Sequence, residues 1–159
     1  IPATSFSSTS NRWLKKQLHG QVGNFQSTDM RNQNWPLELA KFTAEAMSRA
    51  FVWGSWDCGL MAANWIERAT GEKVFLAAYT DALSAQRYIT QRGGMLAAAS
   101  EVLGPPMAHP MGAGRGDVAL VLIDGRECLG VVLGEQVAGP GAEGLRMAPR
   151  NQIIAAWEI

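Results

Sequence analysis

Residues 51–71, FVWGSWDCGLMAANWIERATG, decide the fold of this chain because they carry both ends of a helix. Asp57 is a favoured residue for capping a helix N-terminus, and Gly71 suits the left-handed conformation that closes a helix. Apolar residues recur between them at helical spacing. The segment therefore predicts a helix over 58–70 with Cys58 in its first turn.

Cys58 has two interpretations at that position. The unpaired backbone N–H groups and the positive end of the helix dipole stabilise a thiolate, which makes Cys58 a candidate nucleophile. A free cysteine is also a small apolar residue that often fills a core without any chemistry of its own. Trp53, Trp56 and Trp65 around it are similarly open to two interpretations, an aromatic wall for a ligand or, as is commoner at helical spacing, core residues.

The chain around this segment is predicted to be mainly helical up to about residue 103. A first helix is expected to begin near Trp35, with Pro36 at the first helical position, and to end around Ala50. Two more helices are predicted over 81–92 and 95–103, each followed by glycine. The apolar face of the first helix is expected to consist of Leu37, Ala40, Ala44, Met47 and Phe51.

The pattern changes to strands after the loop GPPMAHPMGAGRG. The runs DVALVLI and ECLGVVLG, joined by Asp124 and Gly125, predict an antiparallel hairpin with a two-residue turn. Further short strands are expected at 135–138, 144–148 and 153–159, with the run AGPGAEG as a turn. Helices first and a small antiparallel sheet second predict an α+β fold.

Composition narrows the classes of function. Lys plus Arg and Asp plus Glu number 14 each, so charge gives no reason to expect a nucleic-acid partner. No apolar run is long enough to insert into a membrane. The 2 cysteines form neither a disulfide framework nor a zinc ligand set. We expect no metal and no cofactor.

The length of the chain is that of one ordinary domain. We expect this domain to span 35–159 and to follow an extended polar arm over 1–34, because the first 29 residues contain few aliphatic side chains and cannot form a core. Met30 is a candidate translation start. The arm is then either an upstream extension or a strand that clasps a partner.

Several segments, in the same order, resemble a known family. WGSWDCGLMAANWI resembles the nucleophile segment of the NlpC-type cell-wall peptidases, which belong to the papain-like superfamily. Gly116-Asp117-Val118 resembles that family's step into its first core strand, and 129–134, LGVVLG, resembles the strand that carries the catalytic histidine. The aromatic-Trp-Gly before Asp57-Cys58 and the Ala-Trp near the C-terminus resemble a branch of phage proteins related to the tail-tip peptidase. This resemblance implies a papain-like fold, with helices packed on a small antiparallel sheet or half-barrel.

The sequence departs from this family at the catalytic base. The family's histidine lies two residues before the strand glycine, and here Gly130 puts Cys128 at that position. For the third polar residue, expected on the following strand, only Gln136 is a candidate. His109, in the loop before the first strand, is the alternative base within the domain, and His19 lies in the arm. Asp57 is interpreted as a helix cap and Asp117 as the residue that precedes a strand.

The resemblance implies that Cys58 and Cys128 face each other across the cleft. They then form either a disulfide, where the geometry allows it, or a pair of thiols in a reducing cytosol. A redox or metal-linked module built on this pair is one hypothesis, although no further ligands with suitable spacing are present.

Two other hypotheses follow from the resemblance. The first is a structural component of a bacteriophage tail tip or baseplate that is built on a degenerate, non-catalytic NlpC-type domain. Its partners would be other phage tail proteins, with which it would assemble in the host cytoplasm. The second is a cysteine-dependent peptidoglycan hydrolase, an endopeptidase or amidase, that uses Cys58 with a non-standard base. General acid–base catalysis contributes about 10²- to 10⁴-fold, so the loss of the histidine favours the first.

Overall fold

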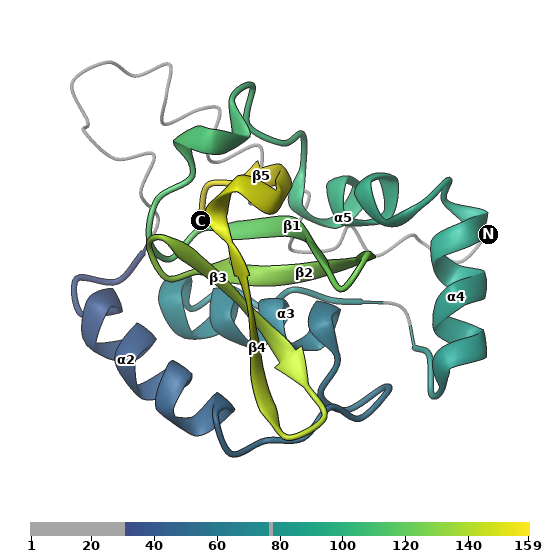
Figure 1. Ribbon diagram of the computed structural model, residues 1–159, viewed down its shortest axis with the longest axis horizontal. Helices are drawn as coiled ribbons and strands as arrows, with labels where there is room; N and C mark the ends of the chain where they lie inside the picture. The colour runs from purple at the N-terminus through teal and green to yellow at the C-terminus, as the bar shows by residue number, and fades with distance from the viewer. Residues whose placement is uncertain (1–30, 77) are drawn as a thin grey trace.

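The computed structural model describes residues 31–76 and 78–159. Within them, helices occupy the first half and an antiparallel sheet the second, so the predicted α+β class is confirmed (Figure 1). The elements are α2 (Trp35–Ala46), α3 (Cys58–Thr70), α4 (Ala82–Gln91), α5 (Met95–Leu103), η1 (Pro110–Gly112), β1 (Val118–Ile123), β2 (Arg126–Val132), β3 (Gln136–Gly141), β4 (Gly144–Pro149), η2 (Arg150–Gln152) and β5 (Ile153–Trp157).

The five strands lie in the order β4-β3-β2-β1-β5. The β1–β2 hairpin turns at Asp124 and Gly125, whose φ angles of 50° and 75° are those of the predicted two-residue turn. The last strand, β5, returns to pair with β1. β2 pairs with β3 only at Val131 and Val132, so the first half of β2 has one unpaired edge. The Cys58 side chain lies at this free edge.

Side chains of the sheet alternate between two apolar clusters. One face, with Leu120, Leu129 and Val131, packs against α2 and α3. The opposite face is covered by the loop around η1, which contributes the buried side chain of Ala113. The helix α3 thus lies against one face of the sheet, with β2 as its main neighbour (Figure 1).

The helix α3 agrees with the sequence prediction at both ends. The Asp57 side chain accepts a hydrogen bond from the N–H of Leu60 at 3.0 Å, and Gly71 closes the helix with a φ of 79°. Midway along the helix, the fully buried Trp65 donates its indole N–H to the carbonyl of Gly116 at 2.8 Å. This bond fixes α3 to the loop that enters β1, which sets the position of Cys58 relative to the sheet.

The predicted first helix was wrong in its end and in its buried face. α2 stops at Ala46, and its buried residues are Leu39, Phe42 and Ala46, whereas Leu37 and Met47 are exposed. The helix ends where the β3–β4 turn packs against it, so closely that a Cβ atom at Gly144 would collide with the carbonyl oxygen of Met47. This tertiary contact is not visible in the local sequence pattern.

The predicted turn AGPGAEG was also partly wrong. Residues through Gly141 continue β3 and pair with β4, with Pro140 opposite Leu145. Proline lacks the N–H that a central strand needs, but it is tolerated on a strand with a free edge. Beyond Ala138, β3 has no pairing with β2, so Pro140 sits where that condition is met.

Residues at the start of the described chain are bound to the domain, although the sequence placed 1–34 in an arm. Arg31 forms a buried ion pair with Asp117 at 3.0 Å and also donates to the carbonyl of Ile159. The N–H of Asn32 donates to Ala69 at 2.7 Å. The packed unit therefore includes residues from Arg31 onward, and the rest of the predicted arm lies outside the described residues.

No helix over 31–76 and 78–159 combines the length and apolar character that crossing a membrane requires.

Candidate functional site

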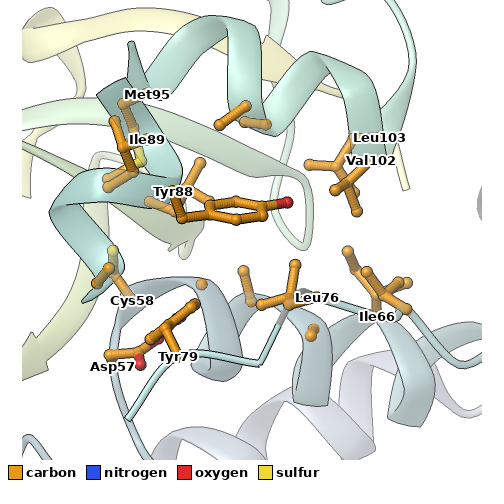
Figure 2. Close-up of a pocket in the computed structure, with 18 of the residues that line it drawn as sticks. Asp57, Cys58, Ile66, Leu76, Tyr79, Tyr88, Ile89, Met95, Val102 and Leu103 are labelled. Atoms are coloured by element: carbon orange, nitrogen blue, oxygen red, sulfur yellow. The ribbon is translucent and has the colours of Figure 1, made fainter. Parts of the chain in front are cut away.

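Cys58 is the first residue of α3 and lines a pocket between α3 and the α4–α5 pair. Figure 2 shows Cys58, Asp57 and Tyr79 together at one end of this pocket. The cysteine is half-buried and is a free thiol. The predicted placement of Cys58 in the first turn of a helix is therefore confirmed.

Asp57 is held by three donors at the entrance to α3. Its carboxylate accepts from the N–H of Leu60 at 3.0 Å, the N–H of Gly54 at 3.0 Å and the hydroxyl of Tyr79 at 2.7 Å. The side chain is only 1% exposed. Burial and the neighbouring Asp57 raise the pKa of Tyr79, so its hydroxyl stays protonated and remains a donor. Asp57 is thus a structural cap, as the sequence indicated.

The thiol of Cys58 meets the free edge of β2. It is hydrogen-bonded to the Cys128 thiol and to the backbone N–H groups of Leu129 and Gly59. These donors lower the pKa of Cys58, Cys128 most strongly, against the opposing effects of burial and of the Asp57 charge. The site therefore holds a sulfur that readily carries negative charge.

Cys128 is the protonated partner of this pair. Its hydrogen bond to Cys58 and its burial raise the pKa of Cys128 above the ordinary thiol range. Its sulfur also lies 3.2 Å from the carbonyl oxygen of Leu129, a second acceptor for the same S–H. On its other side lies Gly139, where a Cβ atom would come within 3.0 Å of the Cys128 sulfur. The structure therefore brings the two cysteines together, as the resemblance implied.

The other two residues proposed from sequence are elsewhere. Gln136 is an exposed residue at the start of β3, and the β3 position beside Cys128 is Gly139. His109 is exposed in the loop that covers the sheet face opposite α3, and it is not among the groups that contact Cys58. Neither residue supplies a base or an orienting group to Cys58 here. His19 lies outside the described residues.

The pocket beside Cys58 is lined almost wholly by apolar side chains. They come from α3, the segment after it, α4, α5 and Leu129 of β2, and the pocket between them is partly open to solvent. Figure 2 shows the ring of Tyr88 extending between the side chains of α5 and those of α3. Asp57, Cys58 and Tyr79 supply the polar groups at one end of the pocket, and the hydroxyl of Tyr88 lies farther along it (Figure 2).

The tryptophans divide between the two interpretations. Trp56 and Trp65 are buried core residues, as helical spacing usually implies. Trp53 is 40% exposed and lines the pocket next to Cys58. Tyr79 was missed from the sequence because it lies 22 residues from Asp57 in a segment without periodic pattern.

Within the described part of the chain, no three His, Cys, Asp or Glu side chains gather as a metal site would require. The pair Cys58 and Cys128 therefore lacks further protein ligands among these residues.

Iodoacetamide is expected to alkylate Cys58 before Cys128 near neutral pH. A lowered pKa shifts the rise of alkylation rate with pH below the ordinary thiol value of about 8.5, whereas the raised pKa of Cys128 shifts its rise above that value. Peptide mapping by mass spectrometry over a pH series measures both profiles. Coincident profiles for the two cysteines would contradict the assigned order of ionisation.

Comparison with known proteins identifies one family. The family described as a domain of unknown function, DUF6950, matches residues 30–159, which includes the whole packed unit. No curated protein matches the chain.

Proposed function

The chain belongs to the DUF6950 family, and we propose that it is a non-hydrolytic structural component of a bacteriophage tail tip or baseplate. In this proposal the domain is a papain-like, NlpC-type fold that has lost its catalytic base. The observation that carries the loss of hydrolysis is the pairing of Cys58 with a thiol, Cys128, in place of an imidazole.

Amide cleavage requires a group that moves protons at the reacting centre. A base must activate the nucleophile, and an acid must then protonate the leaving amine. The donors around Cys58 favour the thiolate, so the nucleophile is activated without a base. Cys128, however, holds its own proton tightly. Both oxygens of Asp57 are occupied by Gly54, Leu60 and Tyr79. Among the described residues, no group is suited to protonate the leaving amine.

The architecture supports the papain-like part of the proposal. A helix that begins with Cys58 packs against an antiparallel sheet. The residue that contacts the Cys58 thiol, Cys128, comes from β2, at the position where the NlpC-type peptidases that the sequence resembles have their histidine. The tail assignment rests on the resemblance of the segment around Cys58 to phage tail-tip proteins. The exposed Trp53, which lines the pocket beside Cys58, is also a residue type that is enriched at interfaces with partners.

The hydrolytic part is tested with purified full-length protein and peptidoglycan stem peptides. We expect no cleavage above that of the Cys58→Ala variant, measured by chromatography of the products over an extended incubation. A tail-tip peptidase with an intact histidine serves as the positive control. Cleavage that disappears in Cys58→Ala would overturn the proposal.

The structural part is tested on virions. The protein is expected to co-purify with tails at a fixed number of copies, measured by mass spectrometry of particles from a phage that encodes it. Loss of the gene is expected to leave tails incomplete. Infected cells that contain the protein and complete virions that lack it would contradict a structural role.

A working thiol hydrolase is the second candidate, favoured by the lowered pKa of Cys58. A catalytic base would then have to come from a partner chain. The two candidates differ in one measurement, because assembled tails would cleave stem peptides in a Cys58-dependent manner only under the second.

A further inference from the structure

We propose that the pocket beside Cys58 binds a linear acyl chain and that Cys58 accepts this chain from an acyl thioester. The inference goes beyond the proposed structural role and does not depend on a phage location. It rests on three features of the described residues: an apolar pocket, a thiol at its polar end, and the absence there of a proton donor for an amine.

The pocket has the chemistry of an alkyl-binding site. Its walls come from small and aliphatic side chains such as Ala62, Ala63, Ile66, Leu76 and Val102, and polar atoms contribute very little of its surface. A cell-wall stem peptide, with its charged groups, would lose hydration there without compensation. A hydrocarbon chain loses none and gains from burial.

The shape of the pocket sets the orientation of the chain. Along α3 its lining residues run from Cys58 through Ala62 to Ile66, two helical turns or about 12 Å. Because the thiol that accepts the acyl group lies at the Cys58 end, an acyl chain places its carbonyl there and its methyl end toward Ile66, past the ring of Tyr88 (Figure 2).

The reaction class follows from the groups around the sulfur. The Cys58 sulfur attacks the carbonyl carbon of the donor thioester, a new carbon–sulfur bond forms, and the donor's carbon–sulfur bond breaks. The leaving thiolate takes the proton that the Cys58 thiol gave up, so the products are the acylated protein and a free thiol. A thiolate can leave without being protonated first, whereas the amine of an amide must be protonated before it leaves. The missing histidine therefore disables amide cleavage and leaves thioester exchange possible.

The test uses the full chain with acetyl, hexanoyl and decanoyl thioesters of N-acetylcysteamine, and intact-mass spectrometry follows the gain of one acyl group. The second-order rate is expected to rise about fourfold for each added methylene that the pocket buries. Peptide mapping is expected to place the acyl group on Cys58, and Cys58→Ser is expected to remove it. Equal rates for all chain lengths, or acylation elsewhere, would overturn the proposal.

A matched pair of variants separates the pocket from general reactivity. Ala63→Phe fills the pocket from α3, and Ala97→Phe adds the same ring at an exposed position of α5 outside it. We expect the first to lower the decanoyl rate at least tenfold with little change in the acetyl rate, and the second to change neither. Thermal unfolding of both variants checks that they fold. A decanoyl rate that Ala63→Phe leaves unchanged would contradict binding in the pocket.

This result and that of the stem-peptide assay are independent. Acylation without peptide cleavage supports both proposals, and cleavage without chain-length dependence overturns both. If the protein shows neither acylation nor peptide cleavage, the acyl site is overturned and the structural role stands.

Discussion

The Cys128→His variant is expected to hydrolyse an activated peptide ester about 10²- to 10⁴-fold faster than the unchanged protein, which is the usual contribution of general acid–base catalysis. Cys128 already contacts the Cys58 thiol, so a side chain at this position of β2 reaches the nucleophile. The neighbouring Gly139 lies close to the Cys128 sulfur, since a Cβ atom there would come within 3.0 Å of it, so the absence of a side chain at this position is what admits the side chain of residue 128. Initial rates measured against pH are expected to show a new ionisation in the range of an imidazole.

Two controls make this result specific. Cys58→Ala combined with Cys128→His is expected to lose the gain, because the nucleophile is absent. Gln136→His places an imidazole on an exposed part of β3, where it is expected to give no gain. A folded Cys128→His protein with unchanged hydrolysis would contradict the proposal that Cys128 stands where a catalytic base once stood.

The Asp57→Ala variant is expected to lose about 3–5 kcal/mol of unfolding free energy. The carboxylate caps α3, and its removal also leaves the N–H of Gly54 and the hydroxyl of Tyr79 without their acceptor. Because this side chain is 1% exposed, water cannot replace it freely. Urea unfolding followed by tryptophan fluorescence measures the loss.

The chain offers a matched control in Asp81, which caps α4 with a side chain hydrogen-bonded to Ser84. Asp81 is exposed, so water satisfies the helix end in Asp81→Ala and the loss is expected to be clearly smaller. The Asp57→Asn variant keeps one acceptor oxygen. Its unfolding free energy is expected to lie between those of the unchanged protein and of Asp57→Ala. Equal losses in Asp57→Ala and Asp81→Ala would show that burial of the Asp57 network adds nothing.

Local signals in the sequence were sufficient for the helix that carries the cysteine. A capping aspartate, a period of apolar residues and a closing glycine act within one segment, so α3 was predicted with both ends correct. The β1–β2 turn at Asp124 and Gly125 was predicted for the same reason. By contrast, α2 ended early because a turn from the far end of the chain, at Gly144, packs against Met47.

The sequence by itself determined the α+β class, the position of Cys58 at a helix N-terminus and the capping role of Asp57, because each depends on neighbours within a few residues. Only the tertiary structure decided that Tyr79 binds Asp57, that His109 lies over the opposite face of the sheet, and that an apolar pocket opens beside the thiol. These facts depend on how segments distant in sequence pack together. Local propensity carries no information about that packing, since the same short patterns pack in many ways.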